Sequence, residues 1–235
     1  MNINFDKKLK QNIENQIKET NLLVIGEIHG IKTNIDVYRY LLKIFQIDYI
    51  AIEWPNLYKQ KLEEYKKDDK INKKRLFENT INDGRFSIEM LDFLKEVENN
   101  RTIKNIICFD NCSSDTKVMD WNRRDQEMAA ELIKKIDRNF NYMVIAGNLH
   151  TKKEPFETEF EKGMKKPMGS YLKNYFGNYP LINIKFKTGS LYNMGIVNLG
   201  NRDKTPSNKI VSMENNNYEV ILDEAFPIDY SFFEK

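Results

Sequence analysis

Short apolar segments that alternate with amphipathic segments constrain this chain more than any other feature. Five of the apolar segments have the length of a strand and are rich in Ile, Val, Tyr and Phe: residues 21–26, 47–53, 103–110, 141–147 and 181–186. Each is almost continuously apolar, which is typical of strands buried on both faces of a sheet. Between them, apolar side chains recur with helical spacing, as from Ile35 to Phe45 and from Trp121 to Ile136. This order of strand, helix and strand predicts an α/β fold.

Alternation of this kind requires crossover connections, so it predicts a mostly parallel central sheet flanked by helices. Two further strand candidates, residues 194–199 and 218–222, indicate a short antiparallel addition at the C-terminal end. Residues 56–100 are strongly charged and too long for one connection, which indicates a helical insertion that could act as a lid. Since no Pro/Gly-rich linker divides the chain, we interpret residues 1–235 as a single domain.

Composition narrows the classes of protein to consider. The chain has 235 residues, of which 40% are hydrophobic, so it can bury a substantial core. Its 37 Lys and Arg residues balance 35 Asp and Glu residues and are interleaved with them, which argues against a nucleic-acid partner. No apolar run reaches the roughly 18 residues needed to span a bilayer, and the start is polar, so we expect a cytoplasmic protein without membrane contact. Cys108 and Cys112 lack a second ligand pair nearby and are expected to be reduced thiols.

The two histidines of the chain both follow an apolar strand segment. The stretch "VIGEIHG" holds Glu27 and His29, and "VIAGNLHT" repeats the pattern of Gly, two residues and His. The carboxyl ends of parallel strands share one edge of the sheet, where α/β proteins place their ligands. Each of the first four strand candidates ends in groups that can donate, accept or bind a metal: Glu27 and His29, Glu53, Asp110, and Asn148 and His150. The sequence therefore predicts a functional site at this edge.

Local spacing suggests roles for some of these residues. Glu27 and His29 are two positions apart in an extended segment, so their side chains point to the same side and can meet one ligand. Arg124 opens the helix that follows the third strand, where a guanidinium group would hold an anionic group or stabilise an oxyanion. Arg39, Asp110 and Asn148 are further candidates for substrate binding. One histidine at a strand end is more often a polar cap, and Arg124 with Asp125 could be a solvated pair; two histidines at matching strand ends favour a site.

Five stretches together resemble the erythromycin esterase-like and ChaN-like superfamily, which includes the TraB and Tiki proteins. These stretches are "GEIHG", "GNLH", "AIEW", "NRRDQEMAAELI" and "KKPMGSYLKNYFGNY", and the likeness runs from about residue 21 to 186. The resemblance implies an α/β fold with its site at the strand ends. It also implies an active-site set of Glu27, His29, Glu53 and His150, with Arg124 nearby.

Chemistry diverges within that superfamily, so the resemblance leaves alternatives. Esterase-like members imply metal-free hydrolysis with histidine as a general base, Tiki-like members imply a metal-dependent peptidase, and ChaN-like members imply haem binding. The Glu27-Ile28-His29 spacing is that of ChaN and Tiki proteins, whereas erythromycin esterases carry one more residue there. Specific hydrolysis of macrolides is therefore not expected.

Our leading hypothesis is a hydrolase of an ester, lactone or amide bond in a small-molecule substrate, with no cofactor required. His29 would activate water with help from Glu27 or Glu53, His150 would act as a second acid or electrophile, and Arg124 would meet the negative charge that develops. Direct attack by water is preferred because no G-x-S-x-G nucleophile elbow occurs. In a variant of this hypothesis, Glu27, His29, Glu53 and His150 hold a divalent metal. The rival hypotheses are a haem or small-ligand binding module, and a degenerate enzyme retained for partner contacts.

Overall fold

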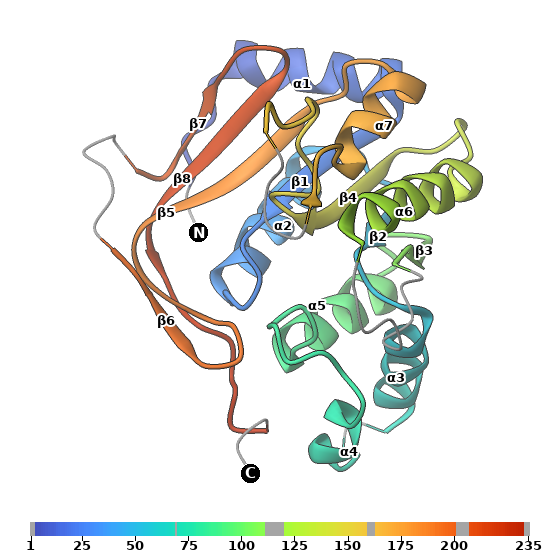
Figure 1. Cartoon of the computed structure of the whole chain (residues 1–235), viewed down its shortest axis with the longest axis vertical. Helices are drawn as coiled ribbons and strands as arrows, with labels where there is room; N and C mark the ends of the chain where they lie inside the picture. Colours follow the sequence, from blue (N-terminus) through green and yellow to red (C-terminus); the bar gives the residue numbers. More distant parts are fainter. Residues whose placement is uncertain (1–2, 69, 111–119, 159–162, 201–206, 233–235) are drawn as a thin grey trace.

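The protein folds around one central sheet with helices on both of its faces (Figure 1). The computed structural model describes residues 3–68, 70–110, 120–158, 163–200 and 207–232. The helices are α1 (Lys7–Thr20), α2 (Thr33–Ile44), α3 (Asn56–Lys67), α4 (Lys73–Phe77), α5 (Ile88–Asn99), α6 (Trp121–Lys135) and α7 (Met168–Phe176). The strands are β1 (Leu22–Glu27), β2 (Tyr49–Ile52), β3 (Asn105–Cys108), β4 (Tyr142–Gly147), β5 (Leu181–Tyr192), β6 (Ile196–Leu199), β7 (Lys209–Ser212) and β8 (Asn217–Ala225).

Strand order within the sheet is β3-β2-β4-β1-β5-β8-β7, and β6 pairs with β5 outside this path. The neighbours from β3 to β8 are parallel, whereas β6 and β7 are antiparallel to their partners. The predicted α/β fold with a mostly parallel sheet and an antiparallel C-terminal addition is confirmed. The two C-terminal strand candidates do not pair with each other, however, because β8 extends the parallel part of the sheet beside β5.

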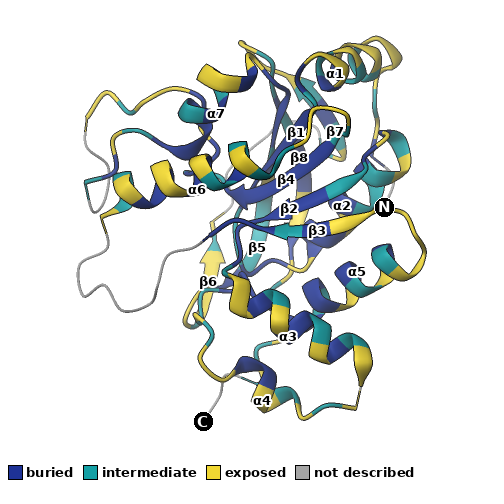
Figure 2. Ribbon diagram, turned by 90° about the vertical axis from the view of Figure 1, so that its right-hand side faces the viewer, coloured by how far each residue is buried: buried dark blue, intermediate teal, exposed yellow. Residues whose placement is uncertain are grey.

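Alternate residues of the central strands pack into two separate layers. Leu23 and Ile25 of β1 join the larger core formed with α1, α2, α3 and α5, whereas Leu22 and Val24 join the core formed with α6 and α7. Figure 2 shows α6 and α7 on one side of the buried strands and α3 and α5 on the other. Because β1, β2 and β4 are covered on both faces, their sequences are continuously apolar.

The charged insertion at residues 56–100 folds as helices, as its sequence predicts. It contains α3, α4 and α5, and its apolar side chains belong to the larger core. Trp54 and Tyr58 pack against Phe86 with ring centroids 5.2 and 4.6 Å apart, which joins the segment between α4 and α5 to the C-terminal end of β2. A closing motion of this segment stays a prediction.

Three elements that the sequence analysis did not assign are α1, α7 and β7. Helix α1 buries only Ile13, Ile17 and Thr20, so its apolar stripe is narrow among charged residues. Strand β7 has four residues and only Ile210 is buried. Short or thinly apolar elements of this kind give a weak periodic signal.

Two expectations from the composition concern membrane-spanning segments and the cysteines. None of the helices in the described ranges is long and apolar enough to cross a membrane. Cys108 is a buried free thiol, and burial raises its pKa to about 12; Cys112 lies outside the described residues.

Candidate active site

The carboxyl ends of β1, β2, β3 and β4 bring the predicted polar side chains together. Glu27 at the end of β1 lies opposite Gly147 at the end of β4, and the Glu53 backbone N–H donates to the Ile145 carbonyl 3.0 Å away. This alignment of the strand ends places Glu27, His29, Glu53, Asp110, Arg124 and His150 in one continuous network of contacts. The spatial convergence that the sequence predicts is therefore present.

Glu27 and His29 form the first half of this network. Nδ1 of His29 lies 2.8 Å from Oε1 of Glu27. The other carboxylate oxygen accepts hydrogen bonds from Asn34, at 3.2 Å, and from the hydroxyl of Tyr38, both on α2. With the carboxylate buried and held on both oxygens, the orientation of the His29 ring is fixed from its Nδ1 side.

Nε2 of His29 faces the interior of the site. Its nearest charged partner is Oε2 of Glu53, at 3.8 Å, which is too long for a hydrogen bond. The side chain of His29 is 21% exposed, whereas that of Glu53 is 3% exposed. A Cβ on Gly147 would lie only 2.9 Å from this Nε2, so the glycine lets the ring approach the end of β4 closely.

His150 forms the second half of the network and is held differently. Its Nδ1 lies 2.9 Å from Oδ2 of Asp125, and its Nε2 lies 2.9 Å from Nη1 of Arg124. A guanidinium group can only donate, so Nε2 of His150 must accept and the ring proton resides on Nδ1. In this arrangement His150 cannot donate a proton from Nε2 unless Arg124 moves away.

Two buried arginines bind the same pair of carboxylates. Oε1 of Glu53 accepts from Arg124 at 2.5 Å and from Arg85 at 2.9 Å. Oδ2 of Asp110 accepts from Arg124 at 2.7 Å and from Arg85 at 3.0 Å. Glu53 also accepts the backbone N–H of Gly147 at 2.8 Å, on its Oε2 atom. Glu53 is therefore the centre that joins the two histidine halves.

The electrostatic environment favours the charged forms of Glu53 and His29. Burial alone would favour the neutral Glu53 carboxyl, but the positive charges of Arg124 and Arg85 favour the carboxylate more strongly and hold its pKa well below the usual range. Burial of the His29 ring disfavours protonation, but the hydrogen bond with Glu27 and the negative charges of Glu53 and Glu27 outweigh it and raise the pKa of His29.

Arg39 and Asn148 do not join this network in the way that the sequence analysis suggested. Arg39 pairs with Glu96 on the surface, with 2.6 Å between Nη2 and Oε2. Its position two turns into α2 carries the side chain away from the strand ends. Asn148 follows β4, where its backbone N–H donates to the Glu27 carbonyl at 2.8 Å.

Sequence reasoning missed Arg85. It is fixed by Asp83, whose carboxylate lies 2.8 Å from Nε, and by two glycines with positive φ. A Cβ on Gly84 would lie 2.4 Å from the Cα of Gly30, so the turn before Arg85 packs directly on the turn after β1. No periodic or spacing signal in the sequence marks this contact.

Asn34, Tyr38 and Asp125 were also missed, although a signal exists for Asn34 and Tyr38. Asn34 and Tyr38 lie one turn apart on α2 and are buried among its apolar residues. Buried polar side chains nearly always have a hydrogen-bond partner, so this position indicates one. Asp125 is completely buried beside Arg124, and it accepts the Met168 backbone N–H at 2.6 Å as well as contacting His150. The interpretation of Arg124 and Asp125 as a solvated pair is therefore wrong.

The donor atoms do not fit a divalent ion in this arrangement. Glu27 is engaged with His29, Asn34 and Tyr38, and Nε2 of His150 is occupied by Arg124. Oε1 of Glu53 already accepts from two guanidinium groups, whose positive charge would repel a cation. Within the described ranges, no group of three or more His, Cys, Asp or Glu side chains is arranged to hold a metal ion.

Fold and site together define an α/β protein with two histidine–carboxylate pairs at the carboxyl edge of a parallel sheet. No protein-family model and no curated protein matches the sequence.

Several solved structures share this fold. A Bacillus cereus protein superposes with a TM-score of 0.64 at 10% identity, covering 94% of this chain and 92% of that one. An erythromycin esterase variant, EreC in its open conformation, gives a TM-score of 0.59 at 10% identity, covering 86% of this chain and 80% of that one. A succinoglycan biosynthesis protein gives 0.56 at 13% identity, covering 95% of this chain and 92% of that one. At these identities the likeness establishes the fold alone.

Proposed function

We propose that this protein is a hydrolase of an ester, lactone or amide bond in a small molecule, with water activated by His29. The observation that carries the proposal is the state of the His29 ring. Its Nδ1 is fixed on the buried Glu27 carboxylate, while its Nε2 has no hydrogen-bond partner among the described residues and the side chain is 21% exposed. A ring fixed on one nitrogen and open on the other is the arrangement a general base requires.

In the proposed mechanism, water lies against Nε2 of His29 and attacks the carbonyl carbon of the substrate. His29 takes the proton at Nε2 as the new C–O bond forms, and Glu27 stabilises the resulting imidazolium at Nδ1. The same proton then passes to the leaving alcohol or amine as the tetrahedral intermediate collapses. His29 returns to its neutral form.

Glu53, Arg124 and His150 shape the electrostatics around this step. Glu53 stays ionised and supports the imidazolium from 3.8 Å. Arg124 commits most of its N–H groups to Glu53, Asp110 and His150, so one Nη1 proton remains for the developing oxyanion. His150 acts through Arg124, which it orients, rather than as the second acid.

The proposal includes membership of the erythromycin esterase-like and ChaN-like superfamily. It is supported by the shared fold of an erythromycin esterase and by the convergence of both G-x-x-H histidines on Glu53.

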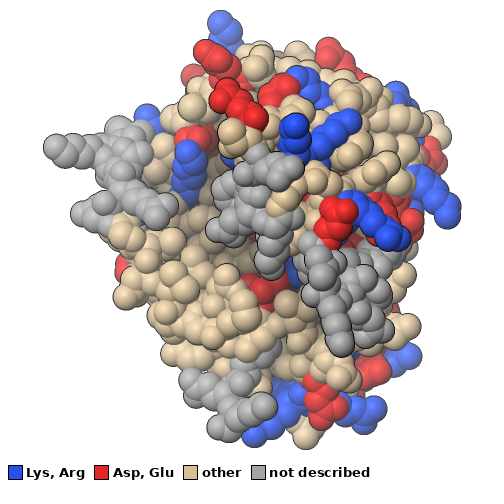
Figure 3. Space-filling view, viewed as in Figure 1, with Lys and Arg blue, Asp and Glu red and all other residues tan. Residues whose placement is uncertain are grey.

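The proposal also includes a small-molecule substrate in place of nucleic acid. On the face in Figure 3, basic and acidic side chains are interspersed over the upper and right-hand parts, which is unlike the basic stripe of a nucleic-acid binder.

A Gly147→Ala variant tests the proposal directly. The added methyl group would lie only 2.9 Å from Nε2 of His29, too close for a carbon atom, so the ring would have to shift from its position, while φ of Gly147 is not positive and suits alanine. We expect kcat/KM on any ester, lactone or amide hydrolysed by the wild type to fall by about 10²-fold or more. The measurement is a hydrolase panel run on purified wild-type and variant proteins.

Gly200→Ala is the matched control, because a Cβ at Gly200 meets nothing within 4 Å. It should leave both activity and thermal stability unchanged. Full activity in the folded Gly147→Ala protein would exclude water attack at Nε2 of His29.

The activity should depend on the protonation of His29. Only the neutral ring accepts a proton, so kcat/KM should rise with pH, and because the pKa of His29 is raised, the midpoint should lie above about pH 6.5. Glu27→Gln removes the charge that favours the imidazolium and should move the midpoint to lower pH. An NMR titration of the two histidine rings checks the assignment independently, and an unchanged midpoint in Glu27→Gln would contradict it.

The arrangement of donors also predicts that chelation has no effect. Activity should survive exhaustive treatment with EDTA, since the positions that a divalent ion would take are occupied by guanidinium groups. Loss of activity with EDTA, restored by one added divalent metal, would instead support the metal-dependent variant.

Titration of the same sample with haem distinguishes the binding-module alternative, which requires a new visible absorption band.

A further inference from the structure

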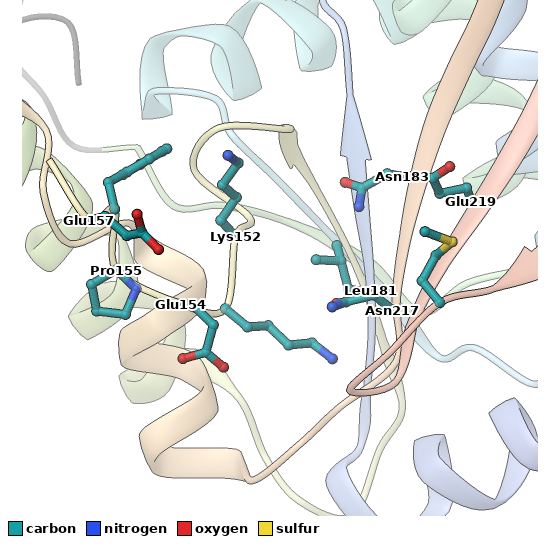
Figure 4. Close-up of a pocket in the computed structure, with 11 residues that line it drawn as sticks. Lys152, Glu154, Pro155, Glu157, Leu181, Asn183, Asn217 and Glu219 are labelled. Atoms are coloured by element: carbon teal, nitrogen blue, oxygen red, sulfur yellow. The ribbon is translucent and has the colours of Figure 1, made fainter. Parts of the chain in front are cut away.

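The turns that carry the two histidines are bordered by different parts of the chain. Beside the His150 turn lies a cavity of about 460 Å³, between residues 152–157 and the starts of β5 and β8 (Figure 4). The turn itself is held by α7, since the Gly169 N–H donates to the His150 carbonyl at 2.8 Å. The turn after His29 is held instead by residues 226–232, which continue from β8 past β6 (Figure 1). We call this segment the strap.

Backbone hydrogen bonds join the strap to the turn after His29. The Ile228 N–H donates to the Gly30 carbonyl at 3.1 Å, and the Lys32 N–H donates to the Phe226 carbonyl at 2.9 Å. Gly30 has a φ of 76° and no side chain that could pack, so contacts from outside the turn are needed to hold its backbone. The strap supplies such contacts from a segment almost 200 residues further along the chain.

Tyr192, at the end of β5, ties the strap to the same turn a second time. Its N–H donates to the Gly30 carbonyl at 3.1 Å, so this one oxygen accepts from both Tyr192 and Ile228. The rings of Tyr192 and Tyr230 stack with centroids 5.2 Å apart and an interplanar angle of 8°. Ile228 is the one buried residue of the strap, and Tyr230 is half-buried. These two side chains are therefore its main anchors beside His29.

Beyond these anchors the strap reaches the insertion that carries Arg85. The Asp229 N–H donates to Oε1 of Glu89, in the first turn of α5, at 2.7 Å. The Phe232 ring stacks on Phe77 of α4, with centroids 5.6 Å apart. The strap therefore connects the two segments from which His29 and Arg85 enter the candidate site.

A general base acts only from a well-defined position, and a displacement of about 1 Å can lower a rate by about 10²-fold. Glu27 fixes the His29 ring at Nδ1, and the strap holds the backbone one residue further on. We propose that the strap positions His29 for proton transfer at Nε2, with Ile228 and Tyr230 as its positioning residues. This inference rests on the proposed hydrolase function, and it adds a dependence of that site on the segment after β8.

The test uses Ile228→Ala and Tyr230→Ala in the full-length, ¹⁵N-labelled protein. We expect each substitution to lower kcat by about tenfold or more and to leave KM unchanged, because the base is displaced and the substrate contacts remain. The ring ¹⁵N signals of His29 should move in both variants, whereas those of His150, held by α7, should stay in place. Since Tyr230 is half-buried, Tyr230→Ala provides a folded variant if loss of the buried Ile228 side chain prevents folding.

Tyr175→Ala is the matched control, since it removes a ring of the same size that is 53% exposed on α7. It should change neither kcat nor the signals of either histidine. The proposal is overturned if kcat and the His29 signals are unchanged in the folded strap variants, or if the signals of both histidines move equally. The ring signals are read without substrate, so absence of hydrolysis by the wild type would contradict the hydrolase proposal and leave the test of the strap valid.

Discussion

Replacing His29 with alanine is expected to lower kcat/KM by about 10²–10⁴-fold, the range that a positioned general base contributes. The reason is local, because Nε2 of His29 is the one nitrogen of the two imidazole rings that no described residue engages in a hydrogen bond. The side chain is partly exposed, so its removal should change the thermal stability little. The measurement is steady-state hydrolysis of a substrate identified with the wild-type protein.

Free imidazole provides a sharper readout than the loss of rate. The space left by the partly exposed His29 ring can admit imidazole from solvent, so added imidazole should restore part of the activity of His29→Ala. His150 is buried at 6% exposure, and imidazole should not rescue His150→Ala. Undiminished hydrolysis in both histidine variants would show that the histidine mechanism is wrong.

Replacing Arg124 with alanine should destabilise the protein by about 3–5 kcal/mol, the usual effect of removing one partner from a buried ion network. The substitution leaves Glu53 and Asp110 buried with Arg85 as their remaining guanidinium partner, and it frees Nε2 of His150. Denaturant unfolding of wild-type and variant proteins measures the change in the free energy of unfolding.

Arg123 offers a control one residue away. Its side chain is 77% exposed and pairs with Glu127 on the surface of α6. Arg123→Ala should therefore change the free energy of unfolding by no more than about 0.5 kcal/mol. Arg124→Lys should restore little of the stability, because one ammonium group cannot replace a planar fork that contacts Glu53, Asp110 and His150 together. Equal losses in Arg123→Ala and Arg124→Ala would contradict the role given to the network.

Parallel strand order made much of the candidate site predictable from the sequence. Strands buried on both faces are continuously apolar, so the polar residue that ends each one stands out, as Glu27 and Glu53 do. Arg124 was found for a related reason, since it opens the helix after the third strand. Arg39 was misjudged because helical spacing does not give the direction of a side chain two turns from the strand end.

Contacts between distant segments account for what was missed. Arg85 reaches Glu53 and Asp110 from a loop of the insertion, through the packing of Gly84 on Gly30. Asp125 resembles a surface residue in the sequence, yet the Met168 end of α7 covers it and His150 binds it. Nothing local in the chain encodes either contact.

The sequence by itself determined the α/β class and the edge at which the polar groups meet, because hydrophobic periodicity and strand direction are local properties of the chain. Only the tertiary structure decided which role each of those polar groups can take. It left Nε2 of His29 without a hydrogen-bond partner among the described residues and covered Nε2 of His150 with Arg124. The physical reason is that ring orientation and hydrogen-bond pairing depend on which neighbours arrive from α2, α6 and the insertion, and those neighbours are set by packing across the whole sheet.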